Sequence, residues 1–387
     1  MPAPHVASAR RWCAASVGTV IAKAATRRYA WGRWLLVLAG AALLAFVIGQ
    51  FMSARALDVD LSRADWRWAG LALVMQAVFF LLYGGLYRYG LQAVGVTSGA
   101  LRLVPVLLAS IFVKTVLPLT AAPAAAVFID DAEVRGQSGA RTAVGLIVVL
   151  VVDLLAALPF IVAGALALIL RAKLVAFALT GTALFVAFIA ALLVGLALAA
   201  SQPALLEALL GACGAVVNRV VRRLGRPALL PDHWARHTTA QLVAAVTSIP
   251  RHPRDIAIAG GYSLLLHVAN LVGLAALFVT FGQSVDAAAL LAGFGMSLVF
   301  YVITIVPDGI GAVEGAMALV FVQLGMPPTT AILVTLAYRV LNVWLPVALG
   351  FWCARRLRLF GAIRLARMQQ PAIEPEPAKA VTEAAEP

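Results

Sequence analysis

Five ionisable residues stand inside otherwise apolar stretches of this 387-residue sequence, where they could bind a charged substrate within a membrane. They are Lys114, Asp153, Asp308, Glu314 and Arg339. A charge at membrane depth costs roughly 2.5–3.5 kcal/mol by insertion scales, so such groups should face protein or water rather than lipid. The cations suit a phosphate, and the carboxylates suit an amine or a coupling cation. We therefore treat the five as candidates for substrate binding and translocation.

Helix breakers lie next to two of these charges. Asp308 and Gly309 follow Pro307, and Gly311 and Glu314 come directly after them. A helix that starts here would direct unpaired backbone N–H groups into the membrane interior, and Asp308 could cap that helix. The candidate site is completed by polar or helix-breaking residues near the other charges: Pro118, Tyr338 and Asn342.

Two pairings among the charges are expected. Glu314 should meet Arg339 on the last span, and Lys114 should meet Asp153, because opposite charges in a membrane stabilise one another. The alternative is that both pairs are buried contacts which only fix helix packing.

The composition excludes an ordinary soluble domain. Hydrophobic residues make up 63% of the chain and charged residues only 12%, whereas soluble domains are nearer half apolar and a quarter charged. We attribute the formal net charge of +13 to basic residues that orient the protein in the membrane and contact an anionic leaflet, so no nucleic-acid partner is expected. The three cysteines are far apart and form no metal-binding motif, so no metal and no cofactor are expected.

The apolar stretches predict an all-α integral membrane protein with about six full transmembrane helices and two broken or re-entrant elements. A spanning helix needs roughly 20 mainly apolar residues. The expected full spans are residues 34–51, 68–90, 142–170, 174–200, 255–281 and 329–353. The broken elements, 103–128 and 288–325, are apolar but interrupted by Pro and Gly; a pair of kinked full spans is the alternative.

The distribution of Lys and Arg predicts the topology. With the N-terminus inside, 23 of the 30 basic residues fall on the inner side, so both termini should be cytoplasmic and the protein should lie in the cell (inner) membrane. We divide the chain into a basic cytoplasmic N-terminus (1–33), a polytopic membrane domain (34–356) and a disordered cytoplasmic tail (357–387).

The largest hydrophilic segment, 201–254, is predicted to be cytoplasmic and amphipathic. Its first half should form a helix along the inner surface with its arginines near anionic headgroups; the alternative is a solvated helix packed on neighbouring loops.

The broken elements share a spacing that is compatible with an inverted repeat. Pro118, Gly136 and Asp153 are 18 and 17 residues apart, and so are Pro307, Gly325 and Asn342. The two units would cover about 68–170 and 255–353. In secondary transporters, paired interrupted helices of this kind meet near the midplane and form the substrate site.

The region 297–352 resembles the membrane region of the lysylphosphatidylglycerol synthase/flippase family and related integral membrane proteins of unassigned function. The family shows a Pro-Gly-Gly-x-Gly-x-x-Glu element, a Gly-x-Pro turn, a Tyr-Arg pair and a Trp-x-Pro. These motifs fall on the following residues: Pro307, Gly309, Gly311, Glu314, Gly325, Pro327, Tyr338, Arg339, Trp344 and Pro346. In the first unit, Leu117, Pro118 and Asp153 also resemble the family, so the similarity covers about 35–355.

The chain also departs from that family. Where relatives carry further charges in the first unit, this sequence reads TAAPAAAVF and VVLVV, so the identity of their substrate should not be transferred. The sequence ends without a cytoplasmic aminoacyl-transfer domain, and it has no nucleophile–base constellation. We therefore expect a protein that is not an enzyme.

The resemblance implies translocation of a lipid between leaflets. Our first hypothesis is a flippase for a polar or zwitterionic lipid, with membrane lipids as partners. The alternatives are a secondary transporter of a small solute or ion, and a non-catalytic membrane scaffold for a lipid-synthesising enzyme. A homo-oligomer is also compatible with the sequence.

Overall fold

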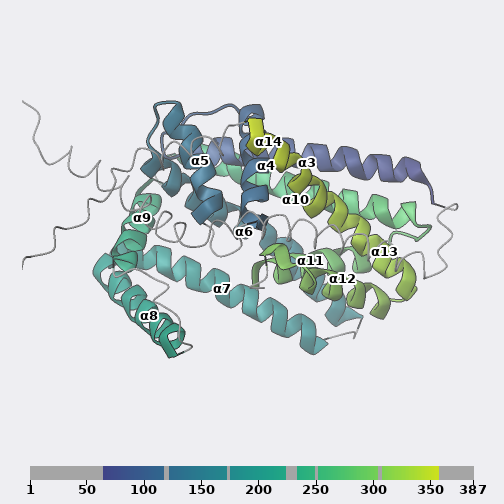
Figure 1. Ribbon diagram of the computed structural model, residues 1–387. Coiled ribbons are helices and arrows are strands. Elements are labelled where there is room, and N and C mark those ends of the chain that lie inside the picture. The colour runs from purple at the N-terminus through teal and green to yellow at the C-terminus, as the bar shows by residue number, and fades with distance from the viewer. Residues whose placement is uncertain are drawn as a thin grey trace, which may run out of the picture. The chain divides into compact units, whose positions relative to one another are not determined.

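The computed structural model describes residues 64–116, 122–171, 175–223, 233–248, 252–303 and 307–356. All regular structure in these ranges is helical, which confirms the predicted all-α class (Figure 1). One compact unit, Ala39–Ala354, holds nearly all of them; the other comprises Met1–Leu38 and Arg355–Pro387. The expected span 34–51, the segments 1–33 and 357–387, and Pro118 lie outside the described residues.

The helices follow the apolar stretches of the sequence. They are α3 (Trp66–Gln92), α4 (Ala100–Val116), α5 (Ala122–Val134), α6 (Gly139–Leu170), α7 (Val175–Ser201), α8 (Pro203–Arg223), α9 (Trp234–Ser248), α10 (Pro253–Thr280), α11 (Ala287–Ile303), η3 (Pro307–Gly309), α12 (Ala312–Gln323), α13 (Pro328–Arg339), η4 (Val340–Trp344) and α14 (Leu345–Arg356).

Six stretches within the described ranges are long and apolar enough to cross a membrane. Five of them lie in α3, α6, α7, α10 and the continuous run Pro328–Arg356, at the places predicted for full spans. The sixth is α8, for which we predicted a place on the membrane surface. Figure 1 shows α8 and α9 at the end of the bundle where α7 finishes. The main packing partners of α8 are α7 and α9.

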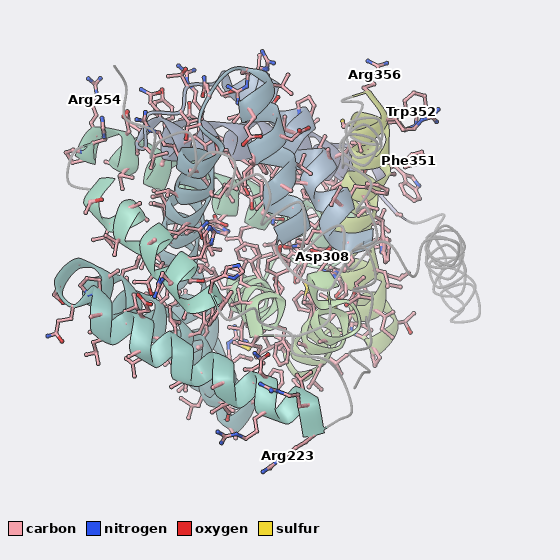
Figure 2. The ribbon with its side chains drawn as sticks, turned by 60° about the vertical axis from the view of Figure 1, so that its left-hand side comes forward. Arg223, Arg254, Asp308, Phe351, Trp352 and Arg356 are labelled. Carbon is pink, nitrogen blue, oxygen red and sulfur yellow. The ribbon has the colours of Figure 1, made fainter. Side chains whose placement is uncertain are left out.

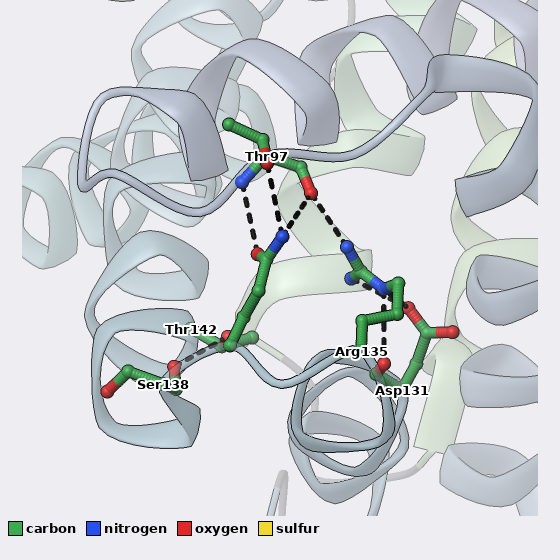
Figure 3. Close-up of polar contacts among 6 residues, drawn as sticks. Thr97, Asp131, Arg135, Ser138 and Thr142 are labelled. Atoms are coloured by element: carbon green, nitrogen blue, oxygen red, sulfur yellow. Dashed lines mark hydrogen bonds and ion pairs between the residues drawn. The ribbon is translucent and has the colours of Figure 1, made fainter.

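Both broken elements are hairpins of two short helices rather than kinked spans. In the first element, α4 and α5 pack on each other, and Thr97 before α4 contacts Arg135 and Gln137 after α5. Arg135 Nη1 donates to the Thr97 carbonyl at 2.7 Å, and Gln137 Nε2 donates to the same oxygen at 2.8 Å. Figure 3 shows this polar clamp. Because its two ends meet, the element enters and leaves on the same side.

The second element folds back in the same way. Gly293 lies early in α11 and Phe321 lies late in α12, and a Cβ on Gly293 would strike the Phe321 ring. The two helices are therefore antiparallel neighbours. With 17 and 12 residues, α11 and α12 are each shorter than the roughly 20 residues that a full span requires. This geometry favours the re-entrant interpretation of the predicted breaks.

Four glycine turns show that the order of elements is repeated. Gly95, Gly136, Gly282 and Gly325 have φ of 80°, 74°, 70° and 99°, in the left-handed region that glycine tolerates. Each of these N–H groups bonds the carbonyl three residues earlier, and the next N–H bonds the carbonyl five residues before itself, which is a Schellman motif. The motif ends α3, α5, α10 and α12, so a long helix, a hairpin and a second long helix occur twice in the same order.

The two copies run in opposite directions. Asp65 at the start of α3 donates its N–H to Thr280 at the end of α10 at 3.1 Å. At the other end of the pair, Gln92 Nε2 lies 3.5 Å from Asp255 Oδ1. The first helices of the two units are thus antiparallel along their length, as an inverted repeat requires.

The last helix of each unit packs against the hairpin of the other unit. Gly164 of α6 faces the backbone of α11 at Leu291 and Gly295, and Gly350 of α14 faces the backbone of α4 at Leu108. Small residues allow such close approach between membrane helices. Each hairpin is therefore packed against a long helix of the other unit.

This close approach gives a stability prediction. A Cβ on Gly295 would lie 2.9 Å from the Phe160 carbonyl oxygen and 3.2 Å from the Gly164 Cα, both of them backbone atoms that cannot rotate away. Gly295→Ala should therefore lower the free energy of unfolding by about 1–3 kcal/mol, measured by thermal unfolding in detergent. Gly195→Ala is the matched control, because nothing lies within 4 Å of its added Cβ. Equal melting temperatures for the two variants would contradict the predicted contact.

Candidate functional site

The second hairpin turns on three left-handed positions among four residues, 308–311. Asp308 has φ 51° and ψ 18°, and Gly309 and Gly311 have φ of 64° and 87°. Aspartate is one of the few residues other than glycine that enter this region readily. The turn delays the start of α12 to Ala312, with Gly311 at the N-cap position. Asp308, which could have capped this helix, therefore does not occupy the N-cap position.

Glu314 takes the capping role instead. Its Oε2 accepts a hydrogen bond from the Gly311 N–H at 2.7 Å. A carboxylate three residues into a helix commonly reaches back in this way and satisfies a backbone donor that has no helical partner. Here that donor belongs to a broken segment within an apolar bundle.

Arg339 of α13 joins Glu314 to the turn. Its Nε donates to Glu314 Oε1 at 2.7 Å, which confirms the predicted pair. Its Nη2 donates to the Asp308 carbonyl oxygen at 2.6 Å. One guanidinium thus holds both the helix start and the turn before it, and its side chain is almost completely buried.

Lys114 contacts the same turn from the first hairpin. Its Nζ lies 2.6 Å from Asp308 Oδ1, and the neighbouring Thr115 hydroxyl donates to Asp308 Oδ2 at 2.6 Å. The expected Lys114–Asp153 pair is therefore wrong, because Asp308 is the partner of Lys114. The contact joins α4 of one unit to the turn of the other, and Figure 2 shows Asp308 among the helices, whereas Arg223 and Arg254 project outward.

The four charges form one neutral group with an accessible edge, and we call Lys114, Asp308, Glu314 and Arg339 the ionic cluster. The Asp308 side chain is 6% exposed, but that of Lys114 is 33% exposed. Lys114 Nζ also donates to the Tyr301 hydroxyl at 2.7 Å and lies 4.8 Å from the centre of that ring. Because Tyr301 is itself 45% exposed, the cation of Lys114 can be reached from outside the bundle.

Asp153 lies in a second polar group. Ser263 Oγ of α10 donates to its Oδ1 at 2.7 Å, and His267 Nε2 lies 3.4 Å from the same oxygen. The sequence had placed Asp153 in the same site as Lys114, whereas the structure gives it other partners.

Tyr338 and Asn342 lie beside an irregular turn in the last span. Residues Val340–Trp344 form one π-helical turn, a feature that frequently marks functional sites. Asn342 Nδ2 donates to the Tyr338 carbonyl at 3.1 Å, so the side-chain amide satisfies a backbone acceptor there.

Sequence reasoning missed Thr115, Tyr301 and Ser263 as partners. Ser263 lies four residues before His267 and so shares its helix face, a signal that was available. Neither Thr115 nor Tyr301 carries a comparable signal, because their partners come from distant helices. In the part of the chain that the structure describes, no three His, Cys, Asp or Glu residues gather as metal ligands.

The buried pair gives a prediction about stability. Arg339→Met would leave the Glu314 carboxylate without its cation, so we expect a loss of about 3–5 kcal/mol, measured by chemical unfolding in detergent. Adding Glu314→Gln should recover part of that loss.

The matched control is Arg171→Met. Arg171 pairs with Asp286 at 3.1 Å, but the two side chains are 51% and 36% exposed, so about 1 kcal/mol or less is expected. Similar losses from the two arginine variants would contradict the importance given to the buried pair.

Comparison with known proteins places this geometry in a family. The model of the lysylphosphatidylglycerol synthase TM region matches residues 33–350, which is most of the chain. The match spans both hairpins and all four residues of the ionic cluster. A search of curated proteins found no match.

Proposed function

The chain belongs to the lysylphosphatidylglycerol synthase transmembrane family, and we propose that it moves a polar or zwitterionic lipid between membrane leaflets where its two hairpins meet. Family membership indicates a function related to membrane lipids, and the helices make the protein a multi-pass membrane protein. Translocation itself, and a phosphate-bearing headgroup as the ligand, are our proposals.

The observation that carries the proposal is the contact between Lys114 and Asp308. It joins two re-entrant hairpins from inversely oriented units, the arrangement in which secondary transporters build a substrate site near the midplane. It also leaves a cation exposed at the edge of an apolar bundle, where a lipid headgroup can arrive from the side.

The arrangement suggests how a headgroup would bind. A phosphate would replace the Asp308 carboxylate as the partner of Lys114, since both are anions that accept charge-assisted hydrogen bonds. Asp308 would keep its hydrogen bond from Thr115 and become free to pair with the amine of a zwitterionic lipid. Arg339 and Glu314 hold the turn in place throughout, because they bind its backbone.

We also propose the orientation of the protein. The end of the bundle at which α3 finishes and α10 begins carries a group of arginines: Arg88, Arg135, Arg141 and Arg254. Under the positive-inside rule this end faces the cytoplasm of a cell membrane, with both chain termini and α8 on that side. The arginines of α8 would then contact anionic headgroups of the inner leaflet.

A carrier of a small solute is the second candidate. Paired re-entrant hairpins in inverted repeats are also the architecture of carriers of soluble solutes. The two candidates differ in where the substrate arrives: a lipid needs a lateral route past Tyr301, whereas a solute needs an aqueous route along the bundle.

The test is leaflet exchange in liposomes of phosphatidylcholine and phosphatidylglycerol. Fluorescent acyl-labelled phosphatidylglycerol, phosphatidylethanolamine and phosphatidylcholine are each followed, in separate vesicles, by chemical quenching of the outer leaflet. The wild type should accelerate exchange over protein-free vesicles, and Lys114→Met should slow it by about tenfold or more, as expected for the loss of one charge-assisted hydrogen bond. Lys114→Arg should retain part of the rate.

The matched control is Arg171→Met, which removes an exposed cation far from the ionic cluster in sequence and should leave the rate unchanged. No acceleration by wild-type protein for any phospholipid class would contradict lipid translocation. Normal exchange in Lys114→Met would contradict the role of the ionic cluster.

A further inference from the structure

A second ionisable group lies buried in the bundle and has no part in headgroup binding. Asp153 is near the middle of α6, and Ser263 and His267 lie one turn apart near the middle of α10. Asp153 receives a hydrogen bond from Ser263 at 2.7 Å, and its side chain is 25% exposed. The His267 side chain is only 6% exposed. An aspartate and a histidine so far from either end of membrane helices lower the stability of the bundle, and such residues usually mark a functional site.

The bonding of His267 is incomplete. Its Nε2 lies 3.4 Å from Asp153 Oδ1, close enough for an ion pair but without the geometry of a hydrogen bond, and neither ring nitrogen has a partner among the described residues. The rings of Phe160 and Phe294 pack around it with centroids 5.5 and 6.3 Å away. A buried imidazole normally satisfies at least one nitrogen, so His267 has hydrogen-bonding capacity that the described residues do not use.

The titratable neighbours of the pair come from several helices. Tyr83 and Tyr87 of α3 are within electrostatic range of Asp153, and Tyr87 is also within range of Lys114 and Tyr301. Tyr338 of α13 reaches Asn270, one turn after His267. Tyr87 is therefore within electrostatic range of both Asp153 and Lys114.

We propose that Asp153 and His267 form a proton-binding site that drives lipid movement with a proton gradient, an inference that rests on the proposed function. With His267 neutral and Asp153 ionised, the pair carries one negative charge. Taking up one proton, on the imidazole nitrogen or the carboxylate oxygen, makes the pair neutral. The proton is bound from one side of the membrane and released to the other, and no other bond is made or broken.

For an anionic member of the proposed polar lipids, the charge balance favours co-transport. A lipid with one net negative charge and one proton would move together without net charge transfer across the membrane. Histidine is the side chain whose charge ordinarily changes between pH 5 and 8, which suits a site that responds to a physiological pH gradient. By the spacing of the repeat, Asp153 also corresponds to Asn342 of the second unit, three residues after Arg339.

The experiment imposes a pH difference across the same liposomes and measures the leaflet distribution of labelled phosphatidylglycerol. With one proton per lipid, a difference of one pH unit should drive a leaflet asymmetry of up to about tenfold. A protonophore should abolish the asymmetry. Asp153→Asn and His267→Gln should lose the response to the gradient while both keep exchange in its absence.

Matched controls are Asp286→Asn, in a side chain that is 36% exposed, and His237→Gln, at an exposed position; both make the same chemical changes and should keep the response. Exchange by the wild type that ignores the gradient would overturn the proton site and leave the proposed function intact. No exchange under any condition would instead contradict the proposed function. The wild-type response to the gradient tests the proton site without any variant, so the test does not depend on whether each variant folds.

Discussion

A helix that breaks within a membrane leaves backbone N–H and C=O groups that lipid cannot satisfy, and this structure depends on how those groups find partners. At the second hairpin the Gly311 N–H is bonded by Glu314, and the Asp308 carbonyl is bonded by Arg339. Glu314 and Arg339 neutralise each other in doing so. The charges proposed for the substrate site thus also bond the backbone of the helix break. Removing the Glu314–Arg339 pair should therefore lower stability as well as activity.

The two units share an architecture but not a chemistry. The four glycine turns and the antiparallel α3 and α10 show the same element order in opposite directions. Among the described residues of the first hairpin, no counterparts of Glu314 and Arg339 are found, and the contribution of this hairpin to the ionic cluster is Lys114, supported by Thr115. The cluster is therefore asymmetric, with one unit fixing the turn and the other offering an exposed cation. We infer that the exposed cation is the part that exchanges partners.

Much of this arrangement could be predicted from the sequence, because it follows from local patterns. Apolar length located the spans, Pro and Gly located the breaks, and the matched spacing of Gly136 and Gly325 located the repeat. The Glu314–Arg339 pair was also foreseen. The partner of Lys114 was not, because the register between helices distant in sequence is set by packing. The left-handed geometry of Asp308 was missed as well, so capping of the helix start was left open for its side chain, which pairs with Lys114 instead.

The most direct test of the central claim asks whether a lipid headgroup reaches the exposed edge of the ionic cluster. A photoreactive phenylalanine analogue introduced at position 301, in the side chain that contacts Lys114, would label molecules that approach this edge in liposomes of phosphatidylcholine and phosphatidylglycerol. The account predicts phospholipid adducts, identified by mass spectrometry, that are strongly reduced when Lys114→Met is added. Adducts whose yield is the same with and without Lys114 would show only bulk lipid at this surface and would contradict the account.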